Sequence, residues 1–153
     1  MKSLFSILLI ILTFQVNSQW VLDYQFVSNV GIFSMSVIDS SNFWFNTADS
    51  LNNRQLYKKY SGNFIPINTL GIIMPNKLTA IDNVSAFLNA GSRRLYKTTN
   101  SGINWIVIRD SVLSGYDYSV DKHSPNFIAA GKTNLDSNLS VLYTSTNRGD
   151  TWI

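Results

Sequence analysis

The sequence predicts an all-β fold built from a repeat of about forty residues. β-Branched and aromatic residues are frequent and only 14% of the 153 residues are charged, a composition that favours sheet over disorder. No helical periodicity stands out after the first eighteen residues. Two short sequence markers recur through the rest of the chain in the same phase, and they indicate the repeat.

The two markers define the period. The first is the dipeptide Leu-Tyr, which begins at Leu56, Leu95 and Leu142 with spacings of 39 and 47 residues. The second is an aspartate that ends a short β-branched run, with spacings of 43 and 39 residues, at Asp39, Asp82 and Asp121. A period of about 40 to 50 residues made of short strands is typical of a β-propeller blade. The predicted fold is therefore a β-propeller of four-stranded antiparallel blades that is incomplete, with about three blades present.

The first 18 residues have the pattern of a cleavable secretory signal peptide. Lys2 precedes an apolar run over residues 4–14, and Val16 and Ser18 offer modest or small side chains before a cleavage site between Ser18 and Gln19. A membrane span needs about 20 apolar residues, roughly twice the length of this run. We therefore expect an exported protein, secreted or at the cell surface, with no integral membrane segment after cleavage.

Residues 19–153 are predicted to form the partial propeller. It divides into a lead-in strand (20–26), a blade (36–67), a second blade (78–108) and an incomplete third blade (118–153). The second blade has four predicted strands, at 78–81, 85–90, 93–98 and 105–108, which are separated by turn-forming Asp, Asn, Gly and Ser residues.

The repeat count leads us to expect a longer parent protein. Propellers usually have about 4 to 8 blades, whereas the third repeat ends one residue after Trp152. A blade without its fourth strand leaves an open sheet edge, which native proteins avoid. We expect a fragment, in which the lead-in strand at Trp20 completes the last blade of the full-length ring. Made alone, the chain is expected to be poorly soluble or self-associating.

The turn before the fourth strand carries a family resemblance. Segments 98–105 and 145–152 both place a hydroxyl residue, Asn, Gly and Trp at matching positions. They resemble the Asp-box, or BNR, motif S-x-D-x-G-x-T-W, with Asn where the family usually has Asp. The first repeat is degenerate, since it is two residues shorter and keeps only Gly62 and Phe64. The predicted structural residues of the motif are Thr98, Asn100, Gly102, Asn104, Trp105, Ser145, Asn147, Gly149, Thr151 and Trp152.

These motif residues suit a structural role. Hydroxyl and amide side chains cap backbone donors in a tight turn, Gly supplies the positive φ that a hairpin requires, and Trp buries a large ring on the blade. We interpret the motif as a marker of the fold and not as a ligand site.

The resemblance also raises the possibility of an enzyme. Asp-box propellers include sialidases and other glycoside hydrolases, which need paired carboxylates or a Tyr nucleophile backed by an acid. This chain has no Glu, and its Phe64-Ile65-Pro66 segment lacks the arginine of the F/Y-R-I-P segment of sialidases. The five arginines fall mostly in turns or at strand ends and are interpreted as solvated surface: Arg54, Arg93, Arg94, Arg109 and Arg148.

No catalytic, cofactor-binding or metal-binding residue is predicted. The three repeated aspartates recur once per blade, as expected for turn caps, whereas a catalytic pair occurs once per ring. With no Cys and only His123, a zinc site is not expected. The net charge of +3 is scattered, with no basic cluster typical of nucleic-acid binding.

Two functions are compatible with these observations. The first is a secreted or cell-surface, non-catalytic propeller that binds a protein or glycan ligand, similar to the propellers of the sortilin ectodomain and the photosystem II assembly factor. The second is a fragment of a secreted glycoside hydrolase whose catalytic residues lie in missing blades. An acid pair facing the central channel would favour the second, and the sequence does not identify the ligand.

Overall fold

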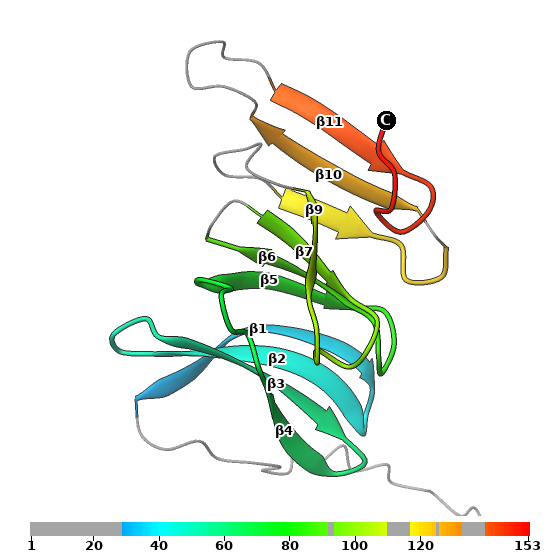
Figure 1. Cartoon of the computed structure of the whole chain (residues 1–153). Helices are drawn as coiled ribbons and strands as arrows, with labels where there is room; N and C mark the ends of the chain where they lie inside the picture. The colour runs from blue at the N-terminus through cyan, green and yellow to red at the C-terminus, as the bar shows by residue number, and fades with distance from the viewer. Residues whose placement is uncertain (1–28, 92–93, 110–116, 125, 133–139) are drawn as a thin grey trace, which may run out of the picture.

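The computed structural model describes residues 29–91, 94–109, 117–124, 126–132 and 140–153. This part of the chain contains eleven β-strands, arranged in three antiparallel sheets, and no helix (Figure 1). The predicted all-β fold with four-stranded antiparallel blades is thereby confirmed. The predicted signal peptide and the lead-in strand at 20–26 lie outside the described residues.

The first sheet is a meander of four strands in sequence order. They are β1 (Val30–Asp39), β2 (Asn42–Asp49), β3 (Arg54–Tyr60) and β4 (Asn63–Ile67). The predicted start of this blade at residue 36 is too late, because β1 already pairs with β2 at Val30 opposite Asp49. A register shift between Ile32 and Ser34 interrupts the two-residue alternation there, which hides the strand from pattern analysis.

The second sheet repeats this arrangement. Its strands are β5 (Pro75–Ala80), β6 (Ala86–Ala90), β7 (Arg94–Thr98) and β8 (Ile106–Arg109). Each lies within a few residues of a strand predicted from the sequence. The largest difference is at β5, which begins at Pro75 because Pro75 already pairs with Ala90 of β6.

The third sheet contains β9 (Asp117–Val120), β10 (Phe127–Lys132) and β11 (Ser140–Ser145). Beyond β11, Ile153 exchanges backbone hydrogen bonds of 2.9 and 3.1 Å with Thr144. In the second sheet the matching pair is Ile106 of β8 opposite Lys97 of β7. Ile153 therefore occupies the place at which a fourth strand begins.

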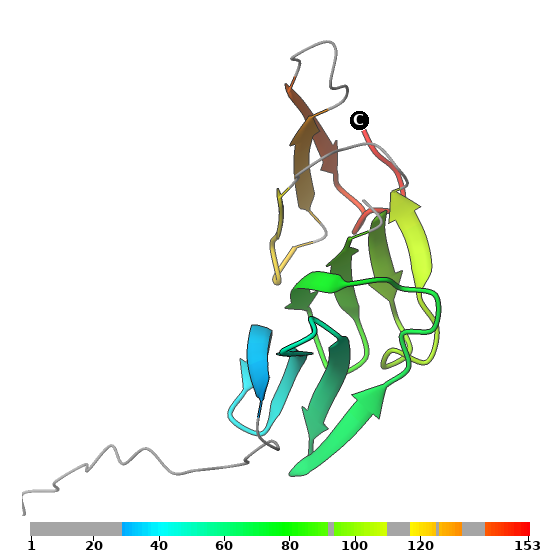
Figure 2. The same ribbon diagram turned by 90° about the vertical axis from the view of Figure 1, so that its left-hand side faces the viewer.

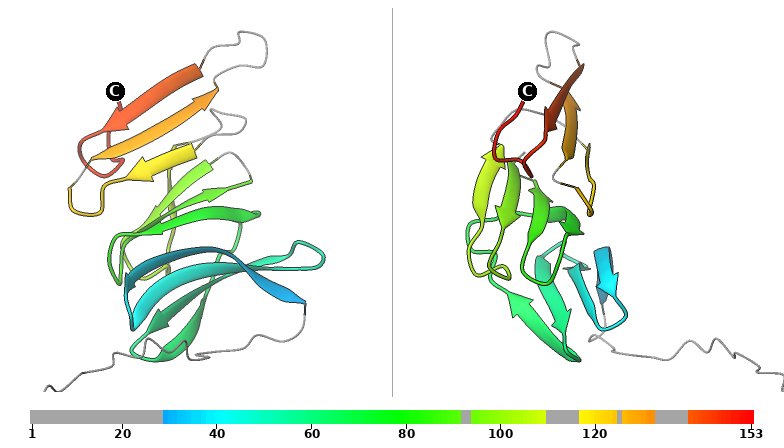
Figure 3. Two further views of the ribbon diagram at one scale, coloured as in Figure 1. Left: turned by 180° about the vertical axis from the view of Figure 1, so that it is seen from behind. Right: turned by 90° about the vertical axis from the view of Figure 1, so that its right-hand side faces the viewer.

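The three sheets follow one another as successive blades, one above the other in Figure 1, and the same order is seen from other sides in Figures 2 and 3. Polar side chains join their first strands. Ser36 Oγ of β1 accepts a hydrogen bond of 2.9 Å from the backbone N–H of Ala80 in β5. Lys77 Nζ of β5 donates to the Tyr118 carbonyl oxygen of β9 at 2.7 Å, and the Tyr118 hydroxyl donates to the Lys77 carbonyl oxygen at 3.0 Å.

Two apolar clusters fill the spaces between the sheets. The first lies between sheets one and two and is centred on Trp44, Leu56, Leu88 and Tyr96. The second lies between sheets two and three and contains Phe87, Leu95 and Tyr118. Full burial of a large apolar side chain such as Phe87 contributes about 1.5–3 kcal/mol. Packing of blade against blade therefore supplies the core.

Candidate functional site

The turn between β7 and β8, residues 98–105, is held in shape by its own side chains. Thr98 Oγ1 accepts a hydrogen bond of 3.0 Å from the Gly102 N–H, and Asn100 Oδ1 accepts one of 3.0 Å from the Asn104 N–H. The Thr98 hydroxyl in turn donates to Asn100 Oδ1 at 3.0 Å. Ser101 and Gly102 have φ values of +62° and +81°. The structure thus brings the motif residues of this segment together as a capped turn.

The turn after β11, residues 145–152, has the same geometry. Ser145 Oγ accepts from the Gly149 N–H at 2.9 Å, and Asn147 Oδ1 accepts from the Thr151 N–H at 2.9 Å. Asn147 Nδ2 adds a bond of 2.9 Å to Thr151 Oγ1. Arg148 and Gly149 have φ values of +55° and +83°. We refer to segments 98–105 and 145–152 as the capped turns.

Each capped turn packs on the last strand of the sheet before it. A Cβ added to Gly102 would lie 2.5 Å from Ile67 Cγ2, and one added to Gly149 would lie 2.7 Å from Ile108 Cδ1. Each turn also ends in a tryptophan that packs against one of the apolar clusters between the sheets. Trp105 packs edge-on against Trp44, with ring centroids 6.4 Å apart, and Trp152 packs against the second cluster. The capped turns therefore fix one blade against the next.

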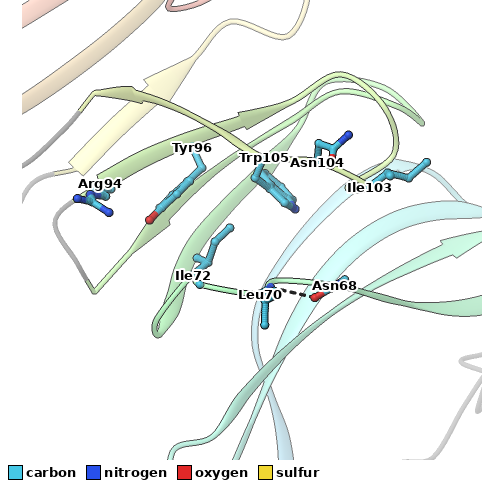
Figure 4. A pocket seen from close by; sticks show the side chains of 9 residues that line it. Asn68, Leu70, Ile72, Arg94, Tyr96, Ile103, Asn104 and Trp105 are labelled. Atoms are coloured by element: carbon cyan, nitrogen blue, oxygen red, sulfur yellow. Dashed lines mark hydrogen bonds between the residues drawn. The ribbon is translucent and has the colours of Figure 1, made fainter.

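A groove lies where the first of these turns meets the first sheet. It consists of two adjoining cavities of about 380 and 430 Å³, which share Asn68 and Ile103. We call them the Tyr96 cavity and the Lys58 cavity, and together the interblade groove. The Tyr96 cavity lies between β7 and the segment 68–72 that follows β4; Figure 4 shows Tyr96 and Trp105 across from Ile72 and Leu70.

The Lys58 cavity is bounded by β4 and by the first capped turn. Its lining is mainly apolar, with Ile65, Pro66, Ile67, Gly102 and Ile103, and its polar lining residues are Lys58, Asn68 and Ser101. At the margin of the groove Leu70 is 91% exposed and Ile103 is 74% exposed. Apolar side chains this open to water at a cavity mouth mark a surface suited to a ligand.

Lys58 is the unusual residue of the groove, because its side chain is only 7% exposed. Its Nζ donates to the Asn83 carbonyl oxygen at 3.2 Å and lies 5.4 Å from the ring centroid of Trp44 and 5.2 Å from that of Tyr60. Ser101 Oγ donates to the same carbonyl oxygen at 3.3 Å. Burial lowers the pKa of Lys58 because it removes water from the ammonium group.

The three repeated aspartates cap the turns that follow the first strand of each sheet. Asp39 Oδ1 accepts from the Ser41 N–H at 2.8 Å, and Asp82 Oδ1 from the Ser85 N–H at 2.6 Å. Asp121 Oδ1 accepts from the His123 N–H at 2.9 Å. The turn-capping role predicted for all three is confirmed.

Hydrogen bonds lower the pKa of three described carboxyl groups. For Asp39 the largest cause is the Asn42 side chain, and for Asp49 it is the Asn53 side chain. For Asp121 it is the His123 N–H. In each case the donors stabilise the ionised carboxylate.

The interpretation of the arginines as solvated surface is wrong for Arg54 and Arg109. The Arg54 guanidinium lies 3.8 Å from the ring centroid of Phe33 and donates to the Pro75 carbonyl oxygen at 3.0 Å. The Arg109 guanidinium lies 3.8 Å from the ring centroid of Tyr143 in the third sheet. The hydrogen bond from Arg54 to Pro75 and the stacking of Arg109 on Tyr143 therefore join neighbouring blades.

Sequence reasoning missed the interblade groove and counted Lys58 only among the scattered charges. One signal for its burial is present, because Lys58 follows Leu56 by two residues and so shares its face of the strand. Among the residues that the structure describes, no group of three or more His, Cys, Asp or Glu side chains is placed to hold a metal ion. The same residues form no helix long and apolar enough to cross a membrane.

Comparison with known proteins identifies the fold. No protein-family model and no curated protein matches the chain. A solved structure of YCF48 bound to a D1 peptide is similar at a TM-score of 0.50 and 20% identity, covering 83% of this chain and 40% of that one. A structure of YCF48 from Cyanidioschyzon merolae is similar at a TM-score of 0.46 and 16% identity, covering 84% and 57%. The chain spans less than two thirds of the length of either structure, and the first likeness supports a β-propeller fold.

Proposed function

We propose that this chain belongs to a non-catalytic β-propeller scaffold that binds an extended segment of a protein partner in the interblade groove. The observation that carries the proposal is the groove itself, whose two adjoining cavities fall in the size range of about 300–1,000 Å³ common to ligand pockets. The walls of the Lys58 cavity are mainly apolar, and Asn68 and Ser101 supply hydrogen-bonding groups between them.

A protein segment fits this surface better than a glycan. The run Ile65-Pro66-Ile67 and the exposed Ile103 form apolar walls, which match apolar peptide side chains. The YCF48 structure that shares the fold holds a D1 peptide, which supports a peptide as the class of ligand.

We also propose that the capped turns are Asp-box turns in which Asn replaces Asp. Their hydrogen bonds and their packing on Ile67 and Ile108 support a structural role for the hydroxyl, Asn and Gly positions of the motif. The glycoside hydrolase alternative gains no specific support, because Asp39, Asp82 and Asp121 are each engaged in their own turn.

Export through residues 1–18 is part of the proposal. It rests on Lys2, the short apolar run and the small residue Ser18. Expression of the whole chain in a secreting host, followed by N-terminal sequencing, is expected to give a mature protein that begins at Gln19. A protein that stays in the cells with Met1 intact would refute export.

Selection of binders from a random peptide library tests the binding function. Selected peptides are expected to lose affinity by about tenfold or more when Ile103→Ser removes an apolar wall of the groove. The matched control is Leu51→Ser, because Leu51 is 81% exposed on the turn between β2 and β3 and lines neither cavity. Peptides that bind both variants equally well would place recognition elsewhere. Competition by oligosaccharides, but not by peptides, would indicate a glycan ligand.

A further inference from the structure

The charge of the interblade groove narrows the class of ligand. Lys58 lines one cavity and Arg94 lines the other, whereas no Asp lines either of them. Each cavity of the groove therefore has one cationic residue in its lining, and in the Lys58 cavity the other walls are mainly apolar. Such a surface favours a segment that combines apolar side chains with negative charge.

Lys58 is the group that makes this preference strong. Its ammonium has three N–H donors, and its one hydrogen bond goes to the neutral Asn83 carbonyl oxygen. Among the described residues, no carboxylate forms a hydrogen bond or an ion pair with Lys58. A buried charge without a counter-ion is costly, and the faces of Trp44 and Tyr60 offset only part of that cost.

The lining of the Lys58 cavity shows how a ligand would supply the missing charge. Ser101 Oγ and Lys58 Nζ converge on one carbonyl oxygen, so both donors lie at the same part of the cavity. Ile65, Ile67 and Ile103 line the same cavity. A carboxylate that enters here meets the remaining N–H donors of the Lys58 ammonium beside apolar side chains, where charge-assisted hydrogen bonds are strong.

We propose that the interblade groove recognises an extended acidic peptide segment, in which one internal Asp or Glu side chain pairs with Lys58 and apolar neighbours occupy the rest of the groove. The acidic residue is internal because the Lys58 cavity continues into the Tyr96 cavity through Asn68 and Ile103, which leaves room for the chain to pass on. This inference rests on the proposed function and adds the chemistry of the ligand.

The test uses two synthetic peptides that differ only in charge, acetyl-Leu-Glu-Leu-amide and acetyl-Leu-Gln-Leu-amide. Their affinities are measured by surface plasmon resonance on the whole chain, immobilised at low density, and on Lys58→Met. The glutamate peptide is expected to bind the unmodified chain about 10- to 100-fold more tightly than the glutamine peptide. On Lys58→Met the two affinities are expected to agree to within about threefold.

A second measurement does not depend on the folding of Lys58→Met. On the unmodified chain, the preference for glutamate is expected to disappear as the pH rises through the lowered pKa of Lys58, because the neutral amine no longer attracts the carboxylate. Equal affinity of the two peptides at neutral pH overturns the inference, and so does a preference that survives in Lys58→Met. If library peptides still depend on Ile103 while showing no acidic preference, only the inference fails. If no peptide depends on Ile103, the proposed function fails as well.

Discussion

The side chain at the third position of each capped turn shows how one functional group shapes a turn. Asn100 and Asn147 each accept the backbone N–H four residues later through Oδ1. An aspartate offers the same acceptor, so Asn and Asp are interchangeable at this atom. The hydroxyls of Thr98 and Ser145 supply the second acceptor, and both residues are buried.

The first prediction concerns Asn100. Replacement by Asp is expected to change the free energy of unfolding by less than about 0.5 kcal/mol, because the acceptor is kept. Replacement by Ala is expected to cost about 1–2 kcal/mol, because the Asn104 N–H loses its partner. Urea unfolding measures both, and Thr99→Ala on the exposed neighbour serves as control. An Asn100→Ala variant as stable as the control would show that the hydrogen bond to the Asn104 N–H does not stabilise the fold.

The second prediction concerns the pH dependence of stability. Hydrogen bonds lower the folded-state pKa of Asp39, Asp49 and Asp121 below the unfolded value of about 3.9. The stability from these groups is therefore fully present above that value and is lost as the pH falls through the folded-state pKa values. The urea midpoint should fall below about pH 4, and it should fall less in a variant with Asn at all three positions. An equal fall in both proteins would assign the acid sensitivity to other groups.

The turn before the fourth strand of a blade exists in a short and a long form. In the first sheet Ser61 and Gly62, with φ of +49° and +83°, join β3 directly to β4. The capped turns keep a similar pair of positive φ values and add residues that reach back to the preceding sheet. The short repeat is therefore a plain two-residue hairpin, and the long form adds the contact between blades.

The third prediction separates these two roles of glycine. Gly62→Ala is expected to cost about 1–2 kcal/mol from the positive φ alone, because nothing lies within 4 Å of the added Cβ. Gly102→Ala is expected to cost about 1–3 kcal/mol more, because its Cβ would lie 2.5 Å from Ile67 Cγ2. In the double variant with Ile67→Ala this excess should shrink, as thermal or urea unfolding will show. An equal loss of unfolding free energy in Gly62→Ala and Gly102→Ala would mean that the first two blades shift to accommodate the added Cβ without loss of stability.

The repeat could be predicted from sequence because its markers have local causes. The aspartates cap turns beside them, and the residues of the capped turns bond within eight positions of one another. The start of β1 and the interblade groove depend instead on pairing and packing between distant segments. Lys58 meets Asn83 only because the first two sheets pack face to face. A pattern within a few neighbouring residues cannot predict a contact between segments that are distant in the sequence.

At the scale of the whole molecule, an apolar face of β1 is left open by the residues that the structure describes, and the last prediction follows from it. On β1, the side chains of Ser34 and Ser36 point toward the second sheet and accept hydrogen bonds from it. The residues that alternate with them have apolar side chains that are about half exposed: Phe33 (54%), Met35 (53%) and Val37 (49%). In a propeller this face of a blade meets another blade. Contiguous apolar surface of this kind promotes association in water.

We therefore expect the chain on its own to self-associate through this face. Sedimentation velocity should show species larger than a monomer, and Met35→Asp with Val37→Asp should shift the distribution toward monomer because charge opposes burial of the face. The control pair is Leu51→Asp with Val84→Asp, which places the same charges on exposed apolar residues in turns (81% and 46% exposed). If both pairs act alike, general solubility and not this face controls association. A monodisperse monomer that unfolds cooperatively on heating would contradict the prediction, because the apolar face of β1 would then be stable in contact with water.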